Sequence, residues 1–190
     1  MNIDNVFSNF LAADQLDIDN DSIVEYCYKA TENVDRKKTV YFSGQEPELK
    51  ELFTEIILRV NDLHKGLGFA DNTYQAFYNA WVNVNENPYA YVPHVHNDCP
   101  GMLFSGVYYP KAGDDANFIE FKNPNPLVSY LVYPNMLKEY NSFNSSVIRI
   151  KPETKHLLIF PSWMQHSIIP ADRTEDRISI AFNTVLKFKE

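Results

Sequence analysis

Hydrophobic residues recur at helical spacing in the first third of the chain. Asp19, Asn20 or Asp21 can cap a helix, and the apolar face of that helix would carry Ile23, Val24, Cys27 and Ala30. A stronger stripe begins after Glu46 and stops before Gly66, where glycine favours helix termination. Its members are Leu49, Leu52, Phe53, Ile56, Ile57, Val60 and Leu63. We expect two helices, a short extended piece over 39–44 between them, and a favourable contact of His64 with the dipole of the second helix.

From residue 73 onward the period changes to two, which predicts strands. Over 73–85 the even positions are apolar or tyrosine, and the odd positions include three asparagines that suit either a polar cavity or a solvated edge. Further strands are expected at Met102–Tyr109, Asn117–Phe121, Ser146–Ile150, His156–Phe160 and Arg177–Leu186. Helices followed by short strands predict an α+β protein built on an antiparallel barrel or jelly roll.

The segment 124–145 interrupts this series of strands. It begins at Pro124, carries Pro126 and Pro134, and contains three tyrosines, Tyr130, Tyr133 and Tyr140. A loop of this length in a compact domain is often a lid or a binding loop, and the alternative is a variable surface insertion with a short helix. We expect a single domain over 1–190, with a mainly helical flank over 1–70 and a β-rich core over 71–190.

Composition narrows the functional classes. The chain has 190 residues, 45% of them hydrophobic, with a net charge of −8 and a pI near 5.1. This acidity argues against extensive contact with nucleic acid or anionic membranes. Two cysteines form no disulfide framework, and no apolar run has the length of a membrane span. These features predict a cytoplasmic protein with no membrane association, and they leave a homodimer open.

Two histidines and an aspartate lie close together just before the strand at 102–109. They are His94, His96 and Asp98. In an extended segment, residues two apart point to the same side, so His94 with His96, or His96 with Asp98, can bind one metal ion. Paired surface histidines are also common, and the cluster alone does not decide between these interpretations.

A third histidine and an arginine strengthen the metal hypothesis. His166 follows an apolar strand and a turn, and Arg177 opens another apolar strand with a serine at 179. A guanidinium inside a barrel needs an anionic partner, because an unpaired buried charge is costly. That partner is either a bound carboxylate or a structural acid such as Asp172, Glu175 or Asp176. If the partner is a bound carboxylate, the pattern describes a metal ion with open coordination positions, next to an arginine and a serine that bind the carboxylate (a carboxylate clamp).

These residues resemble the Fe(II)- and 2-oxoglutarate-dependent dioxygenase superfamily, and more narrowly a group of 2-oxoglutarate oxygenases found in bacteria and tailed phages. The resemblance covers roughly residues 73–186. The stretches that carry it are Trp81-Val82-Asn83, His94-Val95-His96, Ser105-Gly106-Val107-Tyr108-Tyr109, Phe160-Pro161-Ser162-Trp163 with His166, and Arg177-Ile178-Ser179 with Phe182-Asn183. It implies a double-stranded β-helix, cupin-like, with N-terminal supporting helices.

The resemblance also implies the cofactors and the roles of individual residues. Fe(II), 2-oxoglutarate and O₂ would hydroxylate a substrate, with release of succinate and CO₂. His166 would be the distal iron ligand, and Arg177 with Ser179 would bind the distal carboxylate of 2-oxoglutarate. Tyr109 would reach the same carboxylate, and Asn83 would contact the co-substrate from a neighbouring strand.

The first ligand pair departs from the superfamily pattern. Members usually supply a histidine and a carboxylate in an H-x-D/E motif. The register set by Trp81 places His94 and His96 there, which gives a three-histidine site together with His166. A shift of two residues makes the pair His96 and Asp98 and restores the usual set. We favour His94 with His96.

Two other functions are compatible with parts of this pattern. A cupin-like three-histidine dioxygenase that does not use 2-oxoglutarate accounts for the histidines but leaves Arg177 and Ser179 unexplained. A non-catalytic β-barrel binding module would have only structural or surface histidines. The sequence leaves the substrate open between small molecules and peptides, because loops such as 124–145 set specificity.

Overall fold

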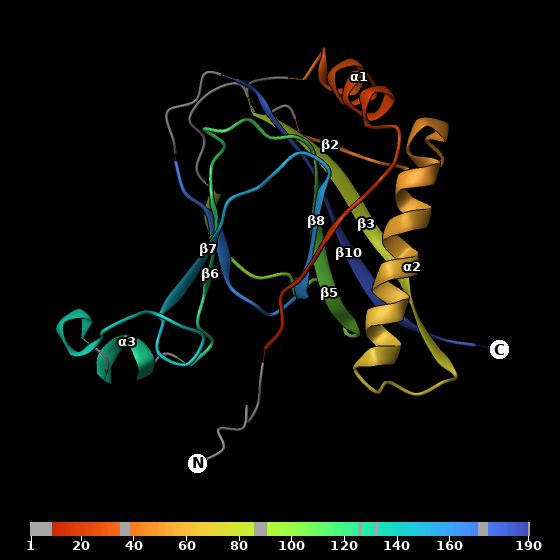
Figure 1. The fold of residues 1–190 in the computed structure, drawn as a ribbon. Coiled ribbons are helices and arrows are strands. Elements are labelled where there is room, and N and C mark those ends of the chain that lie inside the picture. Colours follow the sequence, from red (N-terminus) through yellow and green to blue (C-terminus); the bar gives the residue numbers. More distant parts are fainter. Residues whose placement is uncertain are drawn as a thin grey trace.

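The computed structural model describes residues 9–34, 39–85, 91–125, 127–131, 133–170 and 175–189. Within these ranges the strands form two antiparallel sheets that face each other (Figure 1). The larger sheet has the order β1 (Ala12–Gln15), β8 (His156–Pro161), β5 (Met102–Lys111), β10 (Arg177–Phe188), β3 (Thr73–Asn85) and β2 (Thr39–Tyr41). The smaller sheet has the order β4 (Tyr91–His94), β9 (His166–Ile168), β6 (Ile119–Lys122) and β7 (Val147–Ile150). This is the expected double-stranded β-helix.

Two helices cover the outer face of the larger sheet, as predicted (Figure 1). They are α1 (Asn20–Thr31) and α2 (Lys50–Gly66), the second preceded by a 3₁₀ turn at Pro47–Leu49. Asp19 caps α1 by accepting a hydrogen bond from the backbone N–H of Ser22. The predicted apolar stripe of α2 packs against β3 and its neighbours, with Leu52, Ile56 and Val60 fully buried. Burial of this stripe holds the helix on the sheet.

Alternation along the strands of the larger sheet separates two environments. On β10, Ile178, Ile180 and Phe182 join the core beneath the helices. The alternate residues Arg177, Ser179 and Ala181 line the space between the two sheets. Because successive side chains point to opposite faces, one strand supplies both the hydrophobic core and the inner cavity.

A bulge breaks the alternation of β3, so the prediction of one uninterrupted pattern over 73–85 was wrong. Asn79 pairs with Asn183 and Phe77 pairs with Thr184, which leaves Tyr78 as an extra residue on β3. Before the bulge, the odd-numbered residues of β3 pack under α2. After the bulge, the even-numbered residues face the helices instead. The extra residue therefore turns the second half of the odd face, including Asn83, toward the inner cavity.

The segment 124–145 carries α3 (Leu127–Leu131) and a 3₁₀ turn at Pro134–Met136, and it lies apart from both sheets (Figure 1). It connects β6 to β7 and exposes several large side chains. These are Leu127, Tyr130, Tyr133, Met136, Tyr140 and Phe143. The structure thus contains the short helix that we expected for a surface insertion. Among the described helices, none has the length and hydrophobicity needed to cross a membrane.

Candidate metal centre

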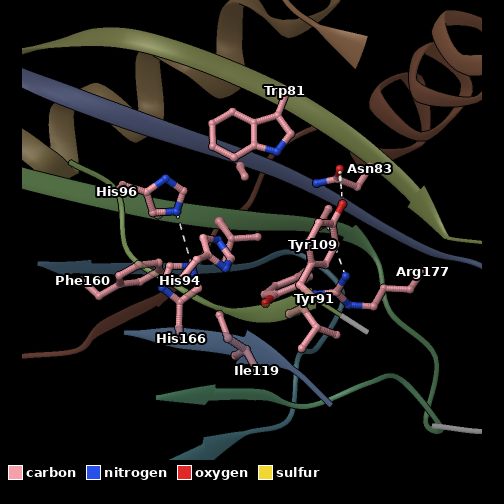
Figure 2. Close-up of a pocket in the computed structure, with 15 residues that line it drawn as sticks. Trp81, Asn83, Tyr91, His94, His96, Tyr109, Ile119, Phe160, His166 and Arg177 are labelled. Atoms are coloured by element: carbon pink, nitrogen blue, oxygen red, sulfur yellow. Dashed lines mark hydrogen bonds between the residues drawn. The ribbon is translucent and has the colours of Figure 1, made fainter. Parts of the chain in front are cut away.

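A cavity of about 70 Å³ lies between the two sheets, and strands from both contribute to it (Figure 2). Its lining includes Trp81, Asn83, Tyr91, His94, His96, Tyr109, Ile119, Phe160, His166 and Arg177. Trp81 and Arg177, almost a hundred positions apart in the sequence, therefore line the same cavity. The site residues implied by the resemblance all line this cavity, including Ser179.

Three imidazoles converge at one end of the cavity. One nitrogen from each of His94, His96 and His166 lies within 4.8 Å of the other two. His94 and His166 are directly paired residues of β4 and β9, and their ring centroids lie 4.4 Å apart. Antiparallel pairing of β4 with β9 thus brings the first histidine motif next to the distal histidine.

Hydrogen bonds orient two of these rings. Nδ1 of His94 lies 2.9 Å from the carbonyl oxygen of Val92, and Nδ1 of His166 lies 3.0 Å from that of Met164. A carbonyl oxygen only accepts, so both Nδ1 atoms carry the proton and both Nε2 atoms present a lone pair. This is the tautomer that metal-binding histidines commonly show, with the outer nitrogen bonded to a backbone carbonyl.

Burial keeps the inner imidazoles neutral. Removal from water, together with the smaller effect of the nearby His94, lowers the pKa of His96 to about 4. Burial, partly offset by the hydrogen bond to Met164 and assisted by the two neighbouring imidazoles, lowers the pKa of His166 to about 3. Nε2 of His96 lies 3.3 Å from Nε2 of His166. Neutral imidazoles that face each other in this way are suitable ligands for a divalent transition metal.

Asp98 stands outside this cluster. Its side chain is exposed, and the described metal-ligating groups that converge here are the three histidines alone. The chain turns between His96 and Gly101, which has a positive φ of 83°. β4 ends at His94 and a bend begins at Asp98, so the two-residue spacing along a strand does not carry over to Asp98.

The Arg177 guanidinium lies at the other end of the cavity. Its side chain is 2% exposed, and no carboxylate of the described residues lies within ion-pair distance. Nη1 donates to Ser179 Oγ at 3.4 Å, and the guanidinium lies 4.9 Å from the centre of the Tyr109 ring. Of the acids considered as structural partners, Asp176 accepts a hydrogen bond from Tyr28, and Asp172 lies outside the described residues.

Two buried polar atoms near this arginine lack a hydrogen-bond partner within the described part of the chain. They are Nε of Arg177 and Oη of Tyr109. Burial raises the pKa of the Tyr109 hydroxyl, and Arg177 offsets part of that rise, so the hydroxyl stays protonated and can donate. Buried donors are normally paired, and two unpaired donors that line one cavity indicate a ligand with acceptor oxygens.

Asn83 is held by two residues that the sequence analysis did not identify. Its Oδ1 accepts hydrogen bonds from Thr39 Oγ1 and from Tyr91 Oη, both at 2.8 Å. Among the described residues, the hydrogen bonds of the Asn83 side chain go to Oδ1, so its amide N–H groups can donate to a ligand in the cavity. Thr39 is detectable only once β2 is known to pair with β3, because no local motif marks it.

The family model described as "Putative 2OG-Fe(II) oxygenase" matches residues 79–183, more than half of the chain. The chain belongs to this family. It is therefore a 2-oxoglutarate-dependent non-haem iron dioxygenase, and Fe(II), 2-oxoglutarate and O₂ are its cofactor and co-substrates. No curated protein matches the sequence.

Solved structures share the fold of this oxygenase at low sequence identity. A prolyl-4-hydroxylase from Pseudomonas putida has a TM-score of 0.64 at 14% identity, covering 94% of this chain and 93% of its own. A prolyl hydroxylase from Trichoplax adhaerens, in complex with a hypoxia inducible factor peptide fragment, has a TM-score of 0.61 at 15% identity, covering 92% and 83%. The epimerase SnoN from nogalamycin biosynthesis has a TM-score of 0.63 at 12% identity, covering 96% and 82%. At these identities the likeness establishes the double-stranded β-helix alone.

The cavity suits the cofactor and co-substrate of the family. The three imidazoles, two of them kept neutral by burial, would hold Fe(II) at one end of the cavity. At the other end, an unpaired guanidinium and an unpaired phenol match the carboxylate of a 2-oxo acid. One end of the cavity therefore suits Fe(II), and the other end suits the carboxylate of 2-oxoglutarate.

Proposed function

We propose that His94, His96 and His166 bind Fe(II), and that the enzyme hydroxylates a C–H bond of a small-molecule or peptide substrate. The observation that carries the proposal is the buried, unpaired Arg177 guanidinium in the same cavity as the three imidazoles. Iron and 2-oxoglutarate, when bound, supply oxidation by O₂ with release of succinate and CO₂. The protein supplies the ligands, the carboxylate clamp and a pocket of suitable shape.

Arg177 and Ser179 hold the distal carboxylate of 2-oxoglutarate in this proposal. The guanidinium offers parallel N–H donors that match a carboxylate, and Ser179 already contacts Nη1. Tyr109 donates its hydroxyl proton to the same group, which satisfies an otherwise unpaired Oη. Asn83 donates an amide N–H from the neighbouring strand, in the orientation that Thr39 and Tyr91 impose.

A three-histidine set is supported over the set that contains Asp98. His94 is paired with His166 across β4 and β9, and its Nε2 is already directed by the bond from Nδ1 to the Val92 carbonyl. Asp98 is exposed and lies in the bend that follows. A ligand that is held in place before the metal binds loses less conformational freedom when it does.

Apolar walls close the cavity around the proposed reaction centre. Ile119 and Ile168 of the smaller sheet line the cavity with His166, and the ring of Phe160 on β8 contacts the His166 ring. They exclude water from the metal, which strengthens electrostatic interactions in the cavity and limits side reactions of the oxidant. The structural neighbours include two prolyl hydroxylases and an epimerase, so we infer C–H oxidation as the reaction class and place small molecules and peptides in the substrate screen.

An anaerobic titration of the Fe(II)-loaded protein with 2-oxoglutarate tests the proposal. Chelation of Fe(II) by a 2-oxo acid gives a weak visible charge-transfer band, and we expect this band in the wild type. In Arg177→Lys, which retains the charge but loses the paired donors, the band should need a much higher 2-oxoglutarate concentration. Arg149→Lys is the matched control, because Arg149 is exposed and pairs with Glu120 on the smaller sheet.

Three results would contradict the proposal at different points. If iron binds but the band does not appear, 2-oxoglutarate does not bind at this site. If Arg177→Lys and the wild type need the same 2-oxoglutarate concentration, Arg177 does not bind its carboxylate. If the wild type does not bind Fe(II), the three histidines are not an iron site.

A further inference from the structure

A tight turn between β8 and β9 contacts two of the three histidines. The backbone N–H of Met164 donates to the carbonyl oxygen of Pro161 at 2.9 Å, which closes the turn. Inside it, the carbonyl oxygen of Ser162 accepts a hydrogen bond from the backbone N–H of His96 at 2.9 Å. The carbonyl oxygen of Met164 lies 3.0 Å from Nδ1 of His166. One short turn therefore holds two of the proposed iron ligands.

His96 depends on this turn more than the other two histidines do. His94 and His166 are directly paired across β4 and β9, and a carbonyl oxygen fixes Nδ1 of each ring. His96 lies after the end of β4, and its Nδ1 has no hydrogen-bond partner in the part of the chain that the structure describes. Both residues that flank His96 are exposed, so little packing holds the backbone there. The bond to Ser162 is therefore the main contact that fixes the backbone of this ligand.

Ser162 is itself fixed to β5 by two hydrogen bonds. Its backbone N–H donates to the carbonyl oxygen of Leu103 at 3.0 Å, and its Oγ donates to the carbonyl oxygen of Met102 at 2.6 Å. The side chain is 2% exposed, so water does not compete for the hydroxyl. These contacts join the larger sheet to the segment that carries His96 away from the smaller sheet.

We propose that Ser162 is a positioning residue for the metal centre, because its hydroxyl fixes the turn carbonyl that holds His96 in its ligand position. The inference deepens the proposed function and rests on it, since His96 acts here as an iron ligand. A ligand set that is held in place before the ion arrives binds it more tightly, because less conformational freedom is lost on binding. Removal of the hydroxyl should leave all three imidazoles present and loosen one of them.

The alternative is a serine that only stabilises the turn, and Ser105 provides the comparison. Ser105 is 1% exposed, and its Oγ donates to Oδ1 of Asn183 at 2.6 Å, the same length as the bond of Ser162. This bond joins β5 to β10 and involves none of the three histidines. Ser105→Ala and Ser162→Ala should therefore lower thermal stability to a similar extent, but only Ser162→Ala should affect the metal centre.

Hydrogen exchange of the metal-free protein, followed by NMR, tests whether the hydroxyl holds the segment. The amide of His96 is hydrogen-bonded in the wild type, so it should exchange slowly. In Ser162→Ala it should exchange several-fold faster, whereas in Ser105→Ala it should exchange as in the wild type. This measurement does not depend on iron, 2-oxoglutarate or turnover.

Titration of the same proteins with Co(II) tests whether the held segment matters for the metal. Co(II) binds to imidazole ligands, and its visible absorption changes with the geometry of those ligands. In Ser162→Ala we expect the dissociation constant to rise about tenfold, at the low end of the roughly 10–100-fold typical of changes behind metal ligands. Its absorption spectrum should also differ from that of the wild type. Ser105→Ala should match the wild type in both affinity and spectrum.

The outcomes distinguish this inference from the proposed function. Unchanged exchange at His96, unchanged Co(II) affinity in Ser162→Ala, or equal losses of affinity in the two variants would overturn the positioning role and leave the proposed iron centre standing. If the wild type binds no Co(II), the three-histidine centre is overturned, and the positioning role with it.

Discussion

The two faces of the larger sheet both contain buried polar groups, but only one face satisfies them. Under the helices, His64 Nε2 lies 2.9 Å from Thr73 Oγ1, and His64 Nδ1 lies 3.3 Å from the amide nitrogen of Gln75. Gln75 Oε1 in turn accepts from Thr184 at 3.0 Å. The expected contact of His64 with the helix dipole was thus incomplete, because His64 is buried in a network that joins α2 to β3 and β10.

Facing the cavity, the corresponding groups remain unpaired. Arg177 Nε and Tyr109 Oη have no partner among the residues that the structure describes. Both faces exclude water, so the difference does not lie in burial. It lies in whether the chain itself provides the partners, and the face that does not is the one prepared for a ligand.

The largest effect should follow from removing a proposed metal ligand. His94→Ala removes one of three imidazoles, and we expect Fe(II) affinity to fall by more than the roughly 10–100-fold typical of changes behind the ligands. His94→Asp, which restores the ligand set usual in the superfamily, should retain more of that affinity than His94→Ala. Equilibrium dialysis with Fe(II) under anaerobic conditions measures this.

Asp98→Asn is the matched control for the ligand pair. Asp98 is exposed and outside the histidine cluster, so its amide variant should bind Fe(II) as the wild type does. If Asp98→Asn loses iron and His94→Ala keeps it, the pair is His96 with Asp98.

Arg177→Met should separate binding from stability. Loss of the charge-assisted hydrogen bonds should weaken 2-oxoglutarate binding by about 3 kcal/mol, roughly 100-fold. The free energy of unfolding without ligand should stay equal or rise, because an unpaired buried charge is replaced by an apolar side chain. Urea denaturation and the KM for 2-oxoglutarate provide the two measurements.

Thr184→Val should show the opposite pattern on the helix-covered face. It leaves Gln75 Oε1 without the donor it has in the wild type, which should cost about 1–3 kcal/mol of unfolding free energy. The KM for 2-oxoglutarate should not change. A stability loss in Arg177→Met as large as that in Thr184→Val would remove the contrast between the two faces.

Gly106→Ala should lower stability through the helix-covered core. A Cβ at this position would lie 2.2 Å from Cζ of Phe182 and 2.6 Å from the carbonyl oxygen of Leu158, so β5 or its neighbours must move. Overpacking of this kind costs about 1–3 kcal/mol. Thermal unfolding measures the loss, and Gly66→Ala, where a Cβ meets nothing within 4 Å, is the control that should not be destabilised.

The smallest effect concerns the pH dependence of His64. Burial lowers its pKa below the ordinary value of 6.5, and Lys189 lowers it further. Thr73 Oγ1 donates to the Ala70 carbonyl, so it accepts from His64 Nε2. The Gln75 amide nitrogen donates to His64 Nδ1, which must then carry a lone pair, so the two contacts together require the neutral ring. The stabilisation is therefore complete above pH 6.5 and is lost as the pH falls below it.

Wild type and His64→Gln should then differ in pH profile. Between pH 7.5 and 5.5 the wild type should lose unfolding free energy relative to the variant, by less than about 1.4 kcal/mol for each pH unit. The comparison cancels the other histidines, which both proteins share. Parallel profiles would mean that His64 does not titrate on unfolding in this range.

Much of the fold was predictable because it depends on local periodicity. The stripe from Leu49 to Leu63 and the alternation over 177–186 correspond closely to α2 and β10. The short strands β1, β4 and β9 were not predicted as strands. Each has only three or four residues, and their pairing with longer strands, rather than their own pattern, holds them in the sheets.

The site was predictable in its residue types and less so in its arrangement. The motifs around His94, His166 and Arg177 indicated a metal and a carboxylate clamp, and the structure places these residues around one cavity. The supporting contacts of Thr39 and Tyr91 with Asn83 had no local signal. They depend on β2 and β4 approaching the same asparagine from different sheets.

The sequence by itself determined the family, the helices, the longer strands and the chemical types of the site residues, because motifs and periodicities are written in neighbouring positions. Only the tertiary structure decided which buried polar groups are paired and which are not. The Tyr78 bulge, the β4–β9 pairing and the exposure of Asp98 each depend on contacts between segments far apart in the chain. A residue's partners are set by packing, and packing is a property of the whole fold.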